Sequence, residues 1–218
     1  MMYKFLLFIS VSSFVGCTKP RTNKAKEIKK STEFIMKKLP DSVLKRKLEL
    51  IGAEDQTLRL LLPEVTNKFG RDSDEYKYVW SLINRQDSIC VNKLIKIINA
   101  YGWIGKSRIG AEANQAIWLV IQHAEVKVQE KHLPLLKESV KKGESEGWHL
   151  AFLEDRVSVY NKKKQVYGTQ AIWDSDLKKN KIYPIEDVKN VNQRRLNLGL
   201  KTIEEYAKSN GHIFDQKE

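Results

Sequence analysis

The chain has 218 residues and a formal net charge of +12, and it contains only 11 glycines and 5 prolines. This composition excludes collagen-like, disulfide-scaffold and low-complexity chains, while 41% hydrophobic residues are enough for a buried core. The positive charge raises nucleic acid or an anionic membrane as partners, so its position along the chain matters.

Residues 1–17 have the pattern of an export signal. A short positive start that ends at Lys4 precedes eleven uncharged residues, Phe5 to Val15. This run is too short for the roughly 20 residues that cross a bilayer as a helix. Gly16 before Cys17 resembles a bacterial lipoprotein signal, which implies a lipidated Cys17 and a membrane-anchored lipoprotein of the cell envelope that faces the periplasm. A secretory signal cut elsewhere, or a buried N-terminal helix, is the alternative.

Residues 18–41 are expected to form a basic tether. Positions 19–47 carry eleven basic and three acidic residues, whereas the chain from Leu48 onward has a charge of only +3. A basic segment beside a lipid anchor suits an anionic bilayer, although a solvated spacer has the same composition. We therefore expect a membrane partner through Cys17 and the tether. No nucleic-acid partner is expected, since the body is nearly neutral and carries no recognition module.

The body of the chain is predicted to be a single, mainly α-helical domain with one small β-hairpin packed on it. Apolar residues at helical spacing, caps and terminating glycines predict the helices. The first predicted helix has Asp41 or Ser42 as its cap and covers 42–62 and beyond, with a bend near Pro63. The second follows a cap candidate among residues 72–74 and runs up to Gly102. Further helices are predicted over 111–124, 133–142 and about 187–198, and a last one starts at the capping box of Thr202 and Glu205.

The spacing of apolar residues changes from a helical period to a two-residue period at the predicted hairpin. Residues 156–160 and 165–170 alternate in polarity around a polar turn at 161–164, which is typical of two short strands. The hairpin is therefore expected near 156–170. The domain is expected to occupy 42–210, with a tail at 211–218.

Two carboxylates fall in phase with apolar stripes. Asp55 continues the series of Leu48 and Ile51, and Asp87 continues the series of Ile83. A carboxylate on a buried face must be paired or protonated, because an unpartnered buried charge costs several kcal/mol. Arg59, four residues after Asp55, is a candidate partner along the helix, and an arginine from elsewhere in the chain would serve equally, with Arg156, Arg194 and Arg195 as the candidates. A structural ion pair and a catalytic acid are both consistent with this pattern.

His123 is the histidine with polar neighbours of a catalytic kind. It ends a strongly apolar segment, between Gln122 and Glu125. As a general acid or base it needs a carboxylate partner, for which Asp55, Asp87 and Glu125 are candidates. The alternative is a core or capping histidine. No metal site is expected, because the other histidines lack paired spacing and Cys90 has no companion after Cys17, and no cofactor is expected.

Seven short motifs occur in a fixed order along the body. They are Asp55-Gln56, Gly102-Trp103, Gln122-His123-Ala124, Leu133 to Leu136, Asp155-Arg156-Val157, Tyr167 to Gln170, and Pro184 to Asp187. With these motifs the chain resembles a bacterial domain-of-unknown-function family, the one numbered six-six-two-four, over about residues 45–208. It departs from the family pattern at Cys90, Ile104 and Glu125.

The resemblance implies a shared set of polar residues around one site, but no activity. That set is Asp55, Gln56, His123, Arg156, Gln165, Tyr167, Gln170, Glu186, Asp187 and Arg195. Two functions remain open. The first is a lipid-anchored binding or interaction module for a small-molecule, peptide or protein ligand, in which Arg59, Asp87 and Gln122 join this set. The alternative is an envelope hydrolase or transferase that uses His123 with Asp55 or Glu125 as general acid and base.

Overall fold

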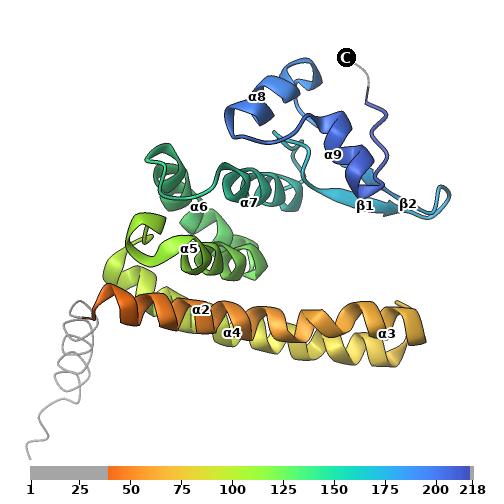
Figure 1. Ribbon diagram of the computed structural model, residues 1–218. Coiled ribbons are helices and arrows are strands. Elements are labelled where there is room, and N and C mark those ends of the chain that lie inside the picture. The colour runs from red at the N-terminus through yellow and green to blue at the C-terminus, as the bar shows by residue number, and fades with distance from the viewer. Residues whose placement is uncertain (1–38, 217–218) are drawn as a thin grey trace, which may run out of the picture.

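A computed structural model describes residues 39–216 and shows a mainly helical single domain with a two-stranded antiparallel hairpin (Figure 1). The predicted signal, the lipidation site Cys17 and nearly all of the tether lie outside the described residues. Among residues 39–216, no helix combines the length and the apolar character needed to cross a bilayer.

The first half of the body is a long helical pair. Helix α2 (Asp41–Thr57), the 3-10 turn η1 (Leu58–Leu61) and α3 (Leu62–Phe69) run alongside α4 (Asp74–Tyr101) (Figure 1). The bend predicted near Pro63 corresponds to this 3-10 turn, which ends at Leu61, two residues before Pro63 in the first turn of α3. Helix α2 begins at Asp41, with Pro40 at the cap position and no side-chain cap, so the predicted Asp41 or Ser42 cap is wrong.

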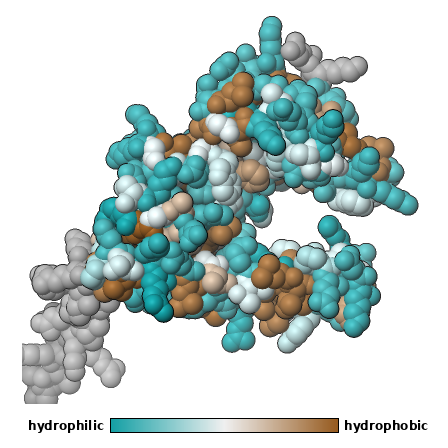
Figure 2. Space-filling model, in the orientation of Figure 1, coloured by the Kyte–Doolittle hydropathy of each residue, from teal (hydrophilic) through white to brown (hydrophobic). Residues whose placement is uncertain are grey.

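The far end of this pair projects as an arm. Between residues 58 and 82 only Val79 is buried, because two helices alone cannot enclose an apolar core. A hollow separates the arm from the part of the chain that carries α9 and the hairpin (Figure 2). The arm ends at Gly70, whose φ of 86° stops α3, and Ser73 caps α4 by accepting a hydrogen bond from the backbone of Tyr76.

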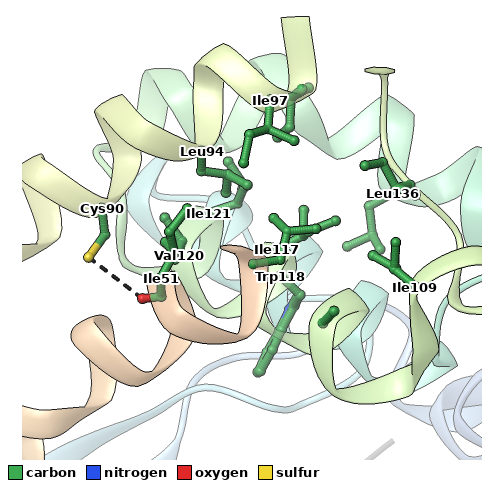
Figure 3. Packing of buried hydrophobic residues seen from close by; sticks show 14 of the residues in the cluster. Ile51, Cys90, Leu94, Ile97, Ile109, Ile117, Trp118, Val120, Ile121 and Leu136 are labelled. Carbon is green, nitrogen blue, oxygen red and sulfur yellow. Dashed lines mark hydrogen bonds between the residues drawn. The ribbon is translucent and has the colours of Figure 1, made fainter. Parts of the chain in front are cut away.

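The main core lies where α2 and α4 meet the next three helices. These are α5 (Lys106–His123), α6 (Val126–Lys141) and α7 (Gly147–Tyr160). Figure 3 shows Leu94 and Ile97 from α4 packed toward Ile117 and Ile121 from α5. Helices α5 and α6 both begin earlier than predicted, and α5 is interrupted at Gly110, where φ is 81°.

Cys90 and His149 both lie in this core. Cys90 is fully buried, with its thiol 3.7 Å from the carbonyl oxygen of Ile51 (Figure 3). His149 stacks on Trp118 at a ring-centroid distance of 4.7 Å. Burial lowers the pKa of His149 to about 4, so this ring is neutral at pH 7 and acts as a flat apolar group.

The predicted position of the hairpin is wrong. Residues 156–160 belong to helix α7, and the strands are β1 (Ala171–Asp174) and β2 (Lys179–Ile182), with Ala171 opposite Ile182. Helix α7 is buried on several sides, at Leu150, Ala151 and Leu153, so it has no single apolar stripe to reveal it. The alternating polarity of residues 156–160 therefore suggested a strand, although these residues are helical.

The last elements form a second, smaller apolar cluster with the hairpin. After η2 (Val188–Asn190) come α8 (Val191–Asn197) and α9 (Ile203–Asn210), where the capping box of Thr202 and Glu205 is confirmed. Ile182 of β2 packs there with Val191 and Ile203. The predicted helix over 187–198 is thus a 3-10 turn followed by a shorter α-helix.

A close approach of α2 and α5 fixes the geometry of the body. An ideal Cβ added to Gly52 would lie 2.7 Å from the Cβ of Ala116, so the two helices touch at a point that excludes a methyl group. The two helices run parallel. At their starts Arg108 of α5 donates to Asp41 of α2, and Gly52 and Ala116 meet further along both helices. One turn further along α2 stands Asp55, and two turns further along α5 stands His123.

We expect Gly52→Ala to destabilise the domain by about 1 to 2 kcal/mol in chemical denaturation. Overpacking costs about 1 to 3 kcal/mol, and the gain of about 1 kcal/mol from replacing a glycine inside a helix offsets only part of it. The matched variant Ala53→Ser, at the exposed neighbouring residue, should change stability by less than about 0.5 kcal/mol. A Gly52→Ala protein more stable than wild type would show that the helix contact does not constrain the fold.

Candidate functional site

His123 and Asp55 form a hydrogen-bonded pair at the junction of α2 and α5. His123 Nδ1 lies 2.8 Å from Asp55 Oδ2. Because an ionised carboxylate can only accept a hydrogen bond, Nδ1 carries a proton, and Nε2 is a free acceptor whenever the ring carries only that one proton. The carboxylate partner of His123, left open between three acids by the sequence, is therefore Asp55.

Asp55 is held in its ionised form despite being only 1% exposed. Burial raises its pKa, but the hydrogen bond and charge of His123, the charge of Arg59 and the amide of Gln56 together lower the pKa below its usual value. Gln56 donates from Nε2 to the same Oδ2 at 2.6 Å. The other oxygen, Oδ1, is buried and has no hydrogen-bond partner within the described residues.

Arg59 joins the two buried carboxylates. It donates to both oxygens of Asp87, at 2.7 and 2.8 Å, and to the backbone carbonyl of Asp55 at 2.7 Å. Its Nη1 lies 3.7 Å from Asp55 Oδ2. The predicted pairing of Arg59 along its own helix thus exists, but the bidentate ion pair is made across to α4.

The pair opens on a surface pocket of about 380 Å³. The His123 side chain is 18% exposed there, and its Nε2 has no hydrogen-bond partner in the described part of the chain. Glu125 also lines this pocket but lies outside ion-pair distance of His123. The remaining polar lining comes from α4, as Asn84, Asp87, Ser88 and Asn92.

Asp55, Asp87 and His123 also have the donor types of a metal site. Each offers one ligand atom, and the three atoms lie within 4.8 Å of one another. Asp and His are ligands for several divalent metals. Spacing along the sequence could not reveal this set, because its members come from α2, α4 and α5. In this structure the guanidinium of Arg59 lies against both carboxylates and supplies the compensating positive charge.

Gln122 and Arg156 form a second pair next to His123. With the Gln122 amide placed so that its oxygen faces the guanidinium, that oxygen accepts hydrogen bonds from Arg156 Nε at 2.7 Å and Nη2 at 3.2 Å. Gln122 itself is 3% exposed. This pair joins α7 to the end of α5. Gln122 and Arg156 therefore lie beside the hydrogen-bonded pair of Asp55 and His123, called the dyad below, without contacting Asp55.

The other predicted residues lie in a different network, around the loop 165–170. Buried Asp155 accepts hydrogen bonds from the loop amides of Val166, Tyr167 and Thr169, while buried Arg195 donates to the carbonyl of Tyr167. Gly168 in this loop has a φ of 76°, and a Cβ there would lie 2.6 Å from Ile203. The network therefore shapes and anchors the loop.

Four further residues of the predicted set serve the same network. Gln165 donates to the carbonyls of Gln170 and Tyr183 and accepts from the amide of Gln170. Glu186 and Asp187 are exposed, and Arg194 donates to the backbone carbonyls of both. None of these residues contacts the dyad, so the expectation that the whole shared set surrounds one site is wrong.

Sequence reasoning missed the α4 wall of the pocket. Asn84, Ser88 and Asn92 recur every four residues and therefore lie on one face of α4, beside Asp87. This spacing can be read from the sequence. Exposed Asn and Ser residues are common on helices, however, so the spacing by itself does not indicate a binding site. Asp155, inside a quoted motif, was also not singled out.

Comparison with known proteins identifies the family. Residues 42–217 match the model of a family of unknown function (DUF6624). The chain belongs to this family. No curated protein and no solved structure matches the chain. The match includes the pair of Asp55 and His123, the pocket beside it and the loop network.

We expect Arg59→Leu to destabilise the domain by about 2 to 4 kcal/mol, since it leaves two carboxylates close together without their cation. Adding Asp87→Asn should restore part of the loss, because the unpaired charge is then gone. Denaturant unfolding of both single variants and the double variant measures this coupling. Arg85→Leu, at an exposed position on α4 outside any ion pair of the described residues, is the control. Strictly additive effects would contradict the coupling.

Proposed function

We propose that this domain is an enzyme, a hydrolase or group transferase, in which His123 acts as general acid and base. The observation that carries the proposal is the hydrogen bond from His123 Nδ1 to buried Asp55, with Nε2 left free on an open pocket. A general base needs a fixed orientation and an accessible lone pair, and this pair has both. Of the two functions open from the sequence, this geometry favours the catalytic one.

The neighbours of the pair support this role. When Nε2 takes a proton from water or a substrate hydroxyl, the ring becomes a cation, and ionised Asp55 stabilises it across the 2.8 Å contact. Gln56 and Arg59 help to keep Asp55 ionised. On the opposite wall, the exposed amides of Asn84 and Asn92 make no side-chain hydrogen bond within the described residues and are free to donate to a substrate.

The first experiment is an activity screen of the full chain purified in detergent. The substrates are p-nitrophenyl acetate, p-nitrophenyl phosphate, p-nitrophenyl N-acetylglucosaminide and isolated cell-wall sacculi, whose soluble products are read by mass spectrometry. We expect turnover of at least one substrate and a loss of about 100-fold or more in kcat for His123→Gln, with an unchanged melting temperature.

Two companion variants test the assignment. Asp55→Asn should also lose activity, since it reverses the hydrogen-bonding preference at His123 Nδ1, and its melting temperature separates this effect from unfolding. Glu125→Gln should retain most of the activity if Asp55 is the partner. Turnover that persists in His123→Gln would overturn the proposal, and no turnover on any substrate would favour the binding module.

We also propose that the protein is a lipoprotein of the cell envelope, attached to the membrane through Cys17 and the basic tether. The support is the sequence pattern of residues 1–17 alone. Cells fed labelled palmitate should incorporate label into the wild type and into Cys90→Ser, and none into Cys17→Ser. The last variant should also leave the membrane fraction. Label retained in Cys17→Ser would refute this anchor.

A further inference from the structure

Arg156 on α7 is a mostly buried cation without an acidic partner. Within residues 39–216, no carboxylate oxygen lies within 4.0 Å of its guanidinium, whereas Arg59, Arg108 and Arg194 each have one. Its Nε and Nη2 donate to the neutral oxygen of Gln122. The phenol of Tyr160 is its other polar partner, and it is neutral as well.

Burial is unfavourable to the Arg156 cation. It lowers the pKa of Arg156, the charge and a hydrogen bond of Tyr160 raise that pKa in part, and the nearby charge of Arg59 adds a smaller lowering. A guanidinium stays protonated in proteins, so the cost appears as lost stability, which a buried counter-ion would reduce. No such counter-ion is present in the described part of the chain.

Arg156 lines a second pocket, of about 410 Å³, which shares no lining residue with the pocket of His123. No acidic residue lines it. Its polar lining is Arg156, Tyr160, Lys162, Gln170 and Tyr183. Lys162 is exposed at its rim, followed by exposed Lys163 and Lys164. A pocket with two cations, two phenols and no carboxylate attracts anions and repels cations.

We propose that this pocket binds the oxyanion group of a small ligand, a phosphate or a carboxylate, through Arg156 and Lys162. Arg156 presents the planar donors that match such a group, and Lys162 adds a mobile charge at the rim. Arg195, which also lacks a carboxylate partner, differs in an informative way. It is fully enclosed, donates to two backbone carbonyls and stacks on Tyr206, so it serves the fold.

The anion site is independent of the proposed catalytic role of His123. Gln122, which holds the guanidinium, directly precedes His123, so a ligand held in this pocket lies near the end of α5. The proposed anion binding depends on the charges of Arg156 and Lys162 and does not require His123. Binding should therefore be unchanged in His123→Gln, which separates the failure of either proposal from the other.

Titration calorimetry of the full chain in detergent tests this site, with inorganic phosphate and acetate as probes at constant ionic strength set by chloride. We expect saturable binding of at least one probe, and the preferred probe identifies the group as phosphate or carboxylate. Arg156→Gln should weaken binding at least 10-fold. Lys162→Gln, at an exposed position that cannot disturb the core, should weaken it several-fold.

Lys163→Gln is the matched control, because it removes the same charge one residue outside the pocket lining. It should leave the affinity within about twofold of wild type. Two results would overturn the proposal. One is a wild type that binds neither probe. The other is an equal loss in Lys162→Gln and Lys163→Gln, which would indicate general surface charge instead of a site.

Discussion

The close contact of α2 with α5 is the constraint on which the candidate site depends. A glycine inside a helix lowers helix stability by about 1 kcal/mol relative to alanine. At Gly52 that cost coincides with a Cβ position only 2.7 Å from Ala116. The helices can approach this closely only without a side chain there, and their approach carries Asp55 to within 2.8 Å of His123. A wider spacing would leave Asp55 buried without its main partner.

Three buried carboxylates, which have little contact with water, are stabilised by three different kinds of partner. Asp55 relies on a histidine and an amide, and Asp87 on the bidentate guanidinium of Arg59. Asp155 relies on three loop amides and the hydroxyl of Thr169, although burial still raises its pKa. Only the first arrangement leaves a reactive atom, His123 Nε2, free at a pocket. The other two fix the positions of helices and of a loop.

The partly or fully buried arginines also differ in how the protein compensates their positive charge. Arg195 donates to two backbone carbonyls and lies over the ring of Tyr206, with only its buried Nη2 unpaired within the described residues, and Arg59 lies against two carboxylates. Arg156 has a neutral amide as its partner and an open pocket in front of it. Enclosed charges compensated by the protein indicate structure, whereas a charge left uncompensated at an opening indicates a ligand. By this criterion Arg156 is the residue that supports the proposed anion site.

The sequence by itself determined the mainly helical class, the α4 helix from its cap to Gly102, the capping box of α9, and the burial of Asp55 and Asp87. Each of these follows from local periodicity or from residues within one turn. Tertiary structure alone decided that 156–160 is helical, that Asp55 is the partner of His123, and that Gln165 and Arg195 hold a loop instead of a site. Those outcomes depend on which helix faces meet, and a contact such as that of Gly52 with Ala116, 64 positions apart, leaves no periodic signal along the chain.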